Sequence, residues 1–277
     1  MRDYKTIINP EVEIENICNW IKSYFVENGN ANTKAVIGIS GGKDSTIAAA
    51  LLCRVLGPDR VFGVLMPQDT QVDIDDSRRI CEHLGIANIE VDIGPACSAL
   101  YRAIDESEGD THHDHSIKNN YMVATNTPSR IRMATLYAVA AVVGGRVVNT
   151  CNWSEEYVGY STKYGDAAGD FTILGHYTVT EVLQIGDALG LPTEFVHKTP
   201  SDGMCGKTDE DNLGFTYAEL DEYIRNDKHP DYETLRLIQE KWRVSRHKRN
   251  AIHLPGPHPQ LLYLDTEGNI IKERDWF

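Results

Sequence analysis

The sequence lacks a long apolar run and a paired-cysteine motif, and each absence excludes a class of protein. No segment of the 277 residues approaches the length of a transmembrane helix, and the polar first residues lack the apolar core of a secretory signal. The six cysteines are scattered without a C-x-x-C pair, which favours free thiols in a reducing compartment. We therefore expect a cytoplasmic protein with no membrane partner.

Basic residues are scarce as well. The chain has 27 Lys and Arg against 41 Asp and Glu, which gives a formal net charge of −14, and no basic run dominates. Because polyanion binding needs clustered Lys and Arg that displace counterions, we expect no nucleic-acid partner and a small-molecule substrate. The sequence also has no Ser-His-Asp or Cys-His arrangement typical of nucleophilic catalysis.

Short apolar segments alternate with helical patterns along the chain. Strands are expected at 35–39, 61–66, 89–93 and 147–150, and helices at about 14–25, 47–56, 73–84, 96–104, 127–143 and 231–246, with further helix starts at 178 and 216. This alternation predicts an α/β fold with a doubly wound, mostly parallel sheet and peripheral helices. We expect one domain over residues 1–253 and a short C-terminal extension, 254–277, that forms a small hairpin packed on the same domain.

A proline marks the expected start of one long helix. Pro128 suits the first position of the helix over 127–143, and a polar break over 107–120 precedes it. The break contains His112–His115, but a solvated loop explains consecutive histidines better than a metal site, because ligand spacing is missing. The helix is apolar round much of its circumference, so it is either core or a subunit interface.

The most informative segment follows the first expected strand. Residues 40–46 read S-G-G-K-D-S-T and lead into a helical run, so glycine N–H groups and a helix N-terminus can approach an anion. A Walker A loop is excluded, because Asp44 stands where Ser or Thr must follow Gly42-Lys43, and Ile37 replaces the first glycine. What remains is the S-G-G-x-D-S loop of enzymes that split ATP between the α and β phosphates, and Asp44 suits a magnesium ion on those phosphates.

A second polar group follows the fourth expected strand. Thr150, Glu155 and residues 161–166, followed by Asp170, come directly after it. In a doubly wound sheet this loop and the Ser40 loop face each other at the carboxyl edge. Such groups suit a magnesium-nucleotide site with a polar second substrate, although on spacing alone a solvated loop explains them equally well.

Four motifs in register resemble the ammonia-dependent NAD synthetases, a family with a Rossmann-like ATP-pyrophosphatase fold. They are Ser40–Thr46, Arg130-x-Arg132-Met133, Lys163–Asp166 and Ser245-x-His247-Lys248-Arg249. The resemblance runs from about Glu11 to Arg249. It implies ATP-dependent amidation of nicotinate adenine dinucleotide (deamido-NAD) by ammonia, which gives NAD, AMP and pyrophosphate through an acyl-adenylate. It also implies a homodimer with the dinucleotide site near the subunit interface.

The resemblance also implies roles for individual residues. The ATP-binding positions are Gly38, Ile39, Ser40, Gly41, Gly42, Lys43, Asp44, Ser45, Thr150 and Ser201. Magnesium would be held by Asp44 and Glu155. The positions that match deamido-NAD contacts are Arg130, Lys163, Asp170, His247 and Lys248. Among these, Asp44, Lys43 and Lys163 are expected to carry catalysis, and the loop over about 200–212 corresponds to a mobile segment that closes over the site.

The chain departs from the family pattern at a few positions. Many relatives have glutamine where this chain has Lys43, and a phosphate-binding lysine where it has Val179. Lys43 either supplies the missing positive charge or points into solvent, and the sequence favours neither. Cys151-Asn152 replaces an acidic-histidine pair common in relatives. No fused glutaminase domain is expected, so the nitrogen source is free ammonia or ammonia from a separate partner.

Two other functions stay open. One is a different ATP-pyrophosphatase ligase that modifies a purine or a tRNA, which the acidic balance and the Lys163 and His247 motifs disfavour. The other is a non-catalytic nucleotide sensor, for which Val179 is the best argument. Intact Asp44 and Glu155 oppose a sensor, because binding an adenine nucleotide does not require both carboxylates.

Overall fold

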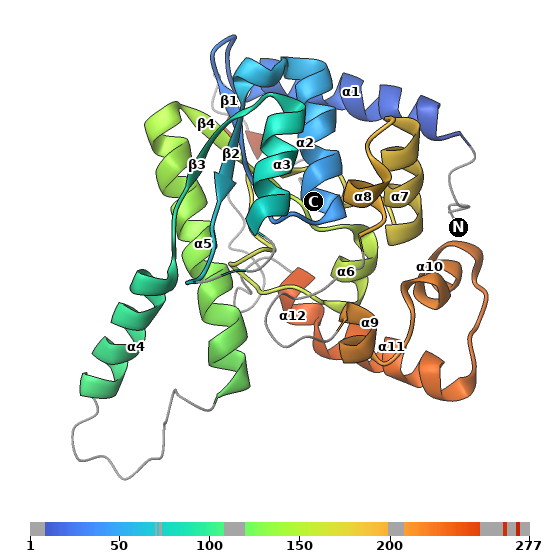
Figure 1. The fold of residues 1–277 in the computed structure, drawn as a ribbon. Coiled ribbons are helices and arrows are strands. Elements are labelled where there is room, and N and C mark those ends of the chain that lie inside the picture. Colours follow the sequence, from blue (N-terminus) through green and yellow to red (C-terminus); the bar gives the residue numbers. More distant parts are fainter. Residues whose placement is uncertain are drawn as a thin grey trace.

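A five-stranded, all-parallel sheet lies at the centre of the molecule and has helices on both faces (Figure 1). The computed structural model describes residues 9–69, 71, 74–107, 120–198 and 208–249, together with two short strands at 263–264 and 270–271. The strands of the sheet are β1 (Lys34–Gly38), β2 (Val61–Leu65), β3 (Ala87–Glu90), β4 (Gly145–Asn149) and β5 (Phe171–Thr172). The predicted α/β, doubly wound fold is confirmed.

The strand order is β3-β2-β1-β4-β5. The chain moves outward from β1 to β2 and β3 and then returns to the other side of β1 for β4 and β5. Val36 of β1 therefore pairs with Phe62 on one side and with Val147 on the other. The topological switch point lies between β1 and β4, and the carboxyl ends of these two strands are where ligands bind in such sheets.

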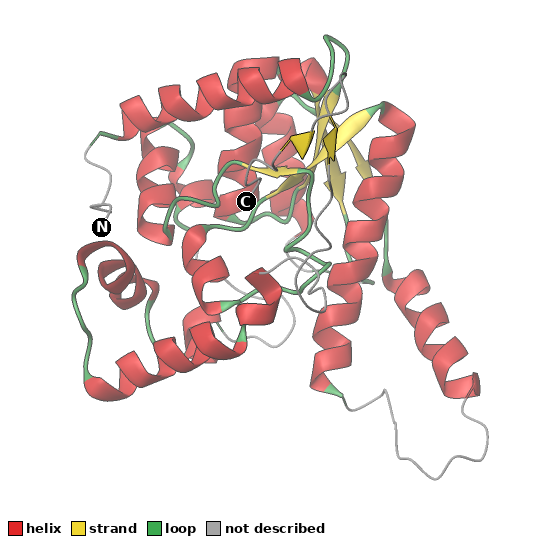
Figure 2. Ribbon diagram, turned by 180° about the vertical axis from the view of Figure 1, so that it is seen from behind, coloured by secondary structure: helices red, strands yellow, loops and turns green. Residues whose placement is uncertain are grey.

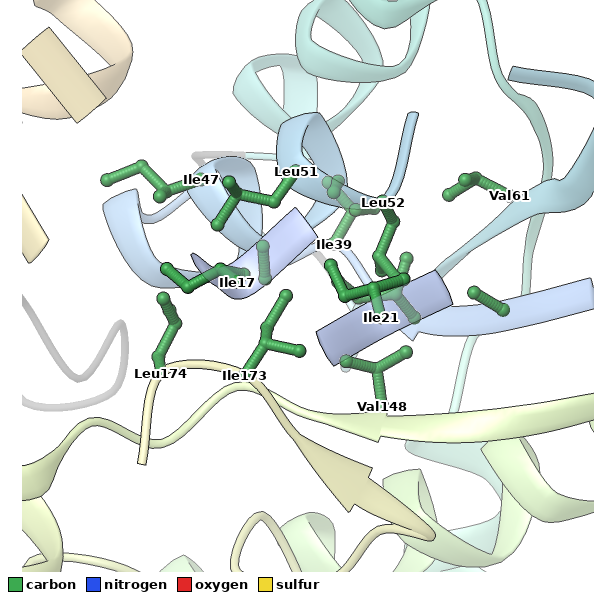
Figure 3. Close-up of a cluster of buried hydrophobic side chains, with 14 of the residues drawn as sticks. Ile17, Ile21, Ile39, Ile47, Leu51, Leu52, Val61, Val148, Ile173 and Leu174 are labelled. Carbon is green, nitrogen blue, oxygen red and sulfur yellow. The ribbon is translucent and has the colours of Figure 1, made fainter. Parts of the chain in front are cut away.

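One face of the sheet is covered by helices that pack through a large apolar core. These helices are α1 (Pro10–Glu27), α2 (Lys43–Leu56), α3 (Ile74–Leu84), α7 (Val179–Ala188) and α8 (Thr193–Val196), and a short 3-10 helix, η1 (Pro58–Arg60), leads into β2. Ile21 of α1 and Leu51 and Leu52 of α2 are fully buried in one cluster with sheet residues such as Val61 and Val148 (Figure 3). Burial of β1 and β2 on both faces explains their continuous apolar runs.

The other face carries α5 (Tyr121–Val143), with α4 (Gly94–Ser107) beside it. The predicted start of α5 is wrong: the helix begins at Tyr121, and Pro128 lies inside it. The amide oxygen of Asn120 accepts hydrogen bonds from the N–H groups of Met122 and Val123 and caps the helix. This cap determines the start, and Pro128 is accommodated within the helix.

The remaining helices gather beyond the carboxyl edge of the sheet (Figure 1). They are α6 (Trp153–Val158), α9 (Asp209–Leu213), α10 (Tyr217–Asn226), α11 (Tyr232–Val244) and α12 (Arg246–Arg249). The capping boxes predicted at Thr178 and Thr216 are both present, paired with Glu181 and Glu219. Figure 2 shows from behind that these helices lie apart from the strands and extend the molecule past them.

Several strand ends differ from the expected ones. The strand expected at 89–93 runs from Ala87 to Glu90, because it pairs with β2 over Phe62–Leu65 and ends with it. The predicted hairpin in the C-terminal extension is confirmed by the antiparallel pairing of β6 (Tyr263–Leu264) with β7 (Ile270–Ile271). The His112–His115 segment lies outside the described residues. Within the described parts, the helices are too short or too polar to cross a bilayer.

Candidate active site

The loop between β1 and α2 is built to receive an anion. Gly41 has φ of +80°, a left-handed backbone conformation that favours glycine. Gly42 precedes α2 without a side-chain cap, and the first N–H groups of a helix have no acceptor within it. The hydroxyls of Ser45 and Thr46 donate to the Gly42 carbonyl at 3.1 Å and 2.8 Å and fix the turn. Together these features form a phosphate cradle with the positive end of the α2 dipole behind it.

The two loops predicted to face each other are in direct contact. The side-chain amide of Asn152 donates to Oδ1 of Asp44 at 3.1 Å, across 108 residues of sequence. Asn152 also caps α6: its side-chain oxygen accepts from the N–H of Glu155, and its own N–H donates to Oε2 of Glu155 at 3.1 Å. The Ser40 loop and the start of α6 therefore meet at the switch point, with Asp44 and Glu155 on either side of Asn152.

Lys43 points into this site, so the alternative in which it points to solvent is wrong. Its ammonium lies 2.8 Å from Oδ2 of Asp44, and its side chain is only 6% exposed. Burial disfavours the charge, but Asp44 and then Glu155 outweigh it and raise the pKa of Lys43 to about 12. The lysine is therefore a buried cation held by acidic neighbours.

Glu155 has the opposite perturbation. Desolvation, and next the negative charge of Asp44, raise the pKa of Glu155 to about 8, while Lys43 opposes the shift. Both carboxylates supply the hard oxygen ligands that Mg²⁺ prefers. Over the described ranges there is no group of three or more His, Cys, Asp or Glu side chains that could hold a metal. Asp44 and Glu155 are thus residues that could hold a magnesium ion together with the phosphates of a nucleotide.

A buried tyrosine borders the same site. Tyr217, at the start of α10, is 4% exposed, and within the described part of the chain its hydroxyl has no hydrogen-bond partner. The ammonium of Lys43 lies 6.0 Å from the centre of the Tyr217 ring. Desolvation, followed by the charges of Glu155 and Asp209, raises the pKa of Tyr217, so it is a neutral hydroxyl. Val179 is buried in the apolar cluster that contains Tyr217.

Three of the residues predicted for the second substrate lie together. Arg130 of α5 donates through Nε to the Lys163 carbonyl at 3.2 Å, and the Lys163 ammonium donates to the His247 carbonyl. Asp166, at the end of the same loop, accepts a 2.6 Å hydrogen bond from the hydroxyl of Ser129 on α5. Elements from α5, the 161–166 loop and α12 thereby form one polar surface.

Asp170 and Lys248 are placed differently. The Asp170 carboxylate accepts from the N–H of Val147 at 2.7 Å and from the Tyr137 hydroxyl at 3.3 Å. It therefore lies beside the middle of β4, away from the Ser40 loop. The Lys248 ammonium donates to the carbonyls of Gly159 and Ser161 at 2.7 Å and 2.6 Å and holds the chain that follows α6.

Thr150 follows β4 at the carboxyl edge and is half-buried, whereas Ser201 and most of the expected lid lie outside the described residues. A cavity of about 230 Å³ lies beneath the 161–169 segment, and Cys151 and Lys248 are among the residues that line it. The cavity adjoins the polar surface and extends it toward β5.

Two residues of the site were not recognised as such from sequence. Asn152 was noted only as a departure from relatives, although Asn152 and Glu155 have the spacing of a capping box. Tyr217 gave no signal beyond its place after a helix cap. Their contacts with the Ser40 loop come from the fold, which brings together parts of the chain that are far apart in sequence.

A phosphate cradle between β1 and α2, with two carboxylates at the switch point, is characteristic of α/β enzymes that bind ATP through an S-G-G-x-D-S loop. The family model described as NAD synthase matches residues 13–252. This chain belongs to the NAD synthase family, whose members are ligases.

Individual relatives cover nearly the same part of the chain. The NH(3)-dependent NAD(+) synthetase of Finegoldia magna is 36% identical over 238 residues, which is 85% of this chain and 92% of that protein. The synthetase of the same name from Archaeoglobus fulgidus is 34% identical over 249 residues, 87% of this chain and 95% of that protein.

Two solved structures of synthetases are similar to this chain over most of its length. The NMN synthetase of Francisella tularensis has a TM-score of 0.80 at 29% identity and covers 90% of this chain and 99% of its own. The NH3-dependent NAD synthetase of Campylobacter jejuni has a TM-score of 0.71 at 25% identity and covers 90% of this chain and 100% of its own.

Proposed function

We propose that the protein amidates the carboxylate of deamido-NAD with ammonia at the expense of ATP, and forms NAD, AMP and pyrophosphate. The observation that carries the proposal is the contact between Asp44 and Asn152, which sets a carboxylate pair against the phosphate cradle. The polar surface of Arg130, Lys163 and His247 lies at the same edge of the sheet. Membership of the NAD synthase family supports this assignment of substrate.

The reaction has two steps. A carboxylate oxygen of the nicotinate ring bonds to the α-phosphorus of ATP, and the bond to pyrophosphate breaks. Ammonia then bonds to the acyl carbon, AMP leaves with the bridging oxygen, and the nitrogen loses a proton. Positioning and charge neutralisation are the main requirements of such phosphoryl transfer, so no protein nucleophile is needed.

Specific groups of this chain meet those requirements. The loop over Gly38–Ser45 binds the phosphates, and Lys43 neutralises their charge at the side facing Tyr217. Asp44 and Glu155 would hold magnesium, which lowers the charge repulsion at the phosphates. Thr150 and Ser201 complete the ATP site.

The substrate carboxylate and its nucleotide are bound by the second group of residues. Lys163 and Arg130 provide positive charge, and His247, Lys248 and Asp170 are the further contacts. In the described structure the Asp170 carboxylate and the ammonium groups of Lys163 and Lys248 bond to backbone groups, so substrate contact by these three requires a rearrangement of those bonds.

The active unit is proposed to be a homodimer formed through α5 and its neighbour α4. Each of these two helices has one end that lies far from the core, and these ends project beyond the rest of the molecule (Figure 1). α5 leaves Val142 86% exposed and Tyr121 61% exposed, and α4 leaves Leu100 40% exposed. A second copy of the chain would cover these side chains and bring the site near Arg130 to the interface.

Two further assignments stand as proposals. The family match ends at residue 252, which supports a domain over 1–253 with a C-terminal extension, 254–277, packed on the same domain. The five described cysteines are free thiols, which supports a cytoplasmic location.

Product analysis tests the proposal. The protein is incubated with ATP, Mg²⁺, ammonium and deamido-NAD, and NAD and AMP are quantified with and without each component. We expect equal amounts of both. AMP formed only with another acceptor would favour a different ligase, and ATP binding without turnover would favour a nucleotide sensor.

A second candidate substrate is the corresponding mononucleotide. The similarity to the NMN synthetase of Francisella tularensis, at a TM-score of 0.80, is the observation that favours it. Measurement of kcat/KM for deamido-NAD and for nicotinate mononucleotide under the same conditions separates the two. We expect the dinucleotide to be preferred, and a higher kcat/KM for the mononucleotide would reverse the assignment.

A further inference from the structure

Asn152 makes more hydrogen bonds than helix capping requires. It is fully buried, and its side-chain oxygen and backbone carbonyl accept from the N–H groups of Glu155 and Glu156. These two bonds cap α6. The side-chain NH2 group is not needed for capping, and it donates instead to Oδ1 of Asp44 at 3.1 Å.

The choice of asparagine follows from that extra bond. Serine, threonine and aspartate cap helices about as well as asparagine, because capping needs only an oxygen acceptor. Among these residues only asparagine offers, in one side chain, an acceptor for the helix and an NH2 donor for a neighbouring carboxylate. Aspartate at this position would instead place a further carboxyl group beside those of Asp44 and Glu155.

Asn152 binds one oxygen of each carboxylate. Its side-chain NH2 group donates to Oδ1 of Asp44, and its backbone N–H donates to Oε2 of Glu155, at 3.1 Å each. The other oxygen of Asp44, Oδ2, already binds a cation, since the ammonium of Lys43 lies 2.8 Å from it. The buried side chain therefore fixes the orientation of the Asp44 carboxylate, and the backbone N–H of the same residue holds the Glu155 carboxylate beside it.

We propose that Asn152 is a positioning residue whose side-chain amide orients Asp44 for magnesium beside Glu155. The inference rests on the proposed function, because that function supplies the magnesium nucleotide. Residues that hold metal ligands in place through hydrogen bonds contribute substantially to metal affinity even though they do not touch the metal.

The test uses Asn152→Ser, which keeps the cap oxygen and loses the amide donor. Mn²⁺ serves as the probe, and electron paramagnetic resonance measures free Mn²⁺ in the presence of an ATP analogue with a methylene group between the α and β phosphates. Thermal unfolding without metal or nucleotide measures the structural cost. Asn9→Ser is the matched control, because Asn9 caps α1 in the same manner, with Val12 N–H at 3.1 Å from its oxygen.

We expect Asn152→Ser to weaken Mn²⁺ binding by about 10-fold or more, and to raise the KM for Mg²⁺ more than it lowers kcat. Asn9→Ser should bind Mn²⁺ like the wild type. Asn152→Thr, which leaves a smaller cavity, should repeat the loss of affinity and serves if the serine variant does not fold. Wild-type Mn²⁺ affinity in either Asn152 variant would overturn the inference.

Asp44→Asn distinguishes the two ways of failing. If this variant loses Mn²⁺ affinity while the Asn152 variants keep it, only the role of Asn152 is refuted. If Asp44→Asn also binds Mn²⁺ like the wild type, the magnesium assignment of the proposed function is refuted together with the inference.

Discussion

Substitution of Lys43 by glutamine removes the buried cation of the site while keeping a polar side chain. The ammonium is 2.8 Å from Asp44, and the side chain is 6% exposed, so solvent screens it little. A hydrogen bond to a charged group contributes about 1.5–3 kcal/mol. At 1.36 kcal/mol for each factor of ten, loss of a Lys43–phosphate contact should raise the KM for ATP about 10- to 150-fold.

Initial rates measured against Mg-ATP, at saturating ammonium and deamido-NAD, provide the assay. Lys43→Met removes the charge and puts no polar group in its place, so it should raise the KM for ATP at least as much as Lys43→Gln does. Lys34→Gln is the control, because Lys34 donates to the Asp59 carbonyl at the surface, far from the cradle. A kcat/KM for ATP within about twofold of the wild type in both Lys43 variants would refute the reasoning, since a contact with a charged group contributes more than that.

The hypothesis that Lys43 supplies positive charge to ATP also predicts the effect of a second variant, Val179→Lys. Val179 begins α7 and is 6% exposed in the cluster that contains Tyr217. If Lys43 replaces the phosphate-binding lysine of relatives, Val179→Lys should restore part of the ATP affinity lost in Lys43→Gln. The double variant is compared with each single variant, and an additive loss of kcat/KM would show that the two positions do not serve the same charge.

Three further predictions concern the buried carboxylate, the unpaired hydroxyl and the exposed face of α5. Because folding raises the pKa of Glu155 from 4.5 to about 8, its contribution to stability is complete below pH 4.5 and is lost as the pH rises through 8. This loss is at most about 5 kcal/mol in the free energy of unfolding, measured by urea unfolding with EDTA, and Glu155→Gln should remove it. A pH dependence of stability in Glu155→Gln equal to that of the wild type would contradict the raised pKa of Glu155. Tyr217→Phe should raise stability by up to about 1 kcal/mol and weaken Mg-ATP binding in calorimetry, and a clear loss of stability would mean that the hydroxyl is paired. Val142→Glu should shift the sedimentation profile from dimer to monomer with little change in thermal unfolding, and a persistent dimer would exclude this face.

Much of the fold follows from sequence because its signals are local. The strand at 34–38 and the loop at 40–46 are adjacent, and the capping boxes at Thr178 and Thr216 depend on residues three positions apart. β5 was not expected, because two residues, Phe171 and Thr172, are too few for an alternation pattern. The start of α5 was misplaced because Pro128 gave a stronger signal than the actual cap at Asn120.

The direction of a charged side chain is the part that sequence did not decide. Lys43 is next to Asp44 at the start of a helix, and this local pattern is compatible with a lysine that faces water or the protein. The outcome depends on Glu155 and Asp209, whose negative charges help to keep the buried ammonium protonated. These residues reach the site only after β4 has returned to the centre of the sheet and α9 has packed beyond its edge.

Positions 43, 152 and 179 belong to one connected group in the structure. Val179 packs in the cluster that contains Tyr217. The ring of Tyr217 lies 6.0 Å from the ammonium of Lys43, which is bonded to Asp44, and Asp44 is bonded to Asn152. The buried cation at the start of α2 and the apolar side chain at the start of α7 thus both contact or border Tyr217. The substitutions at 43, 152 and 179 are therefore best tested in combination, because each changes the electrostatic surroundings in which the others act.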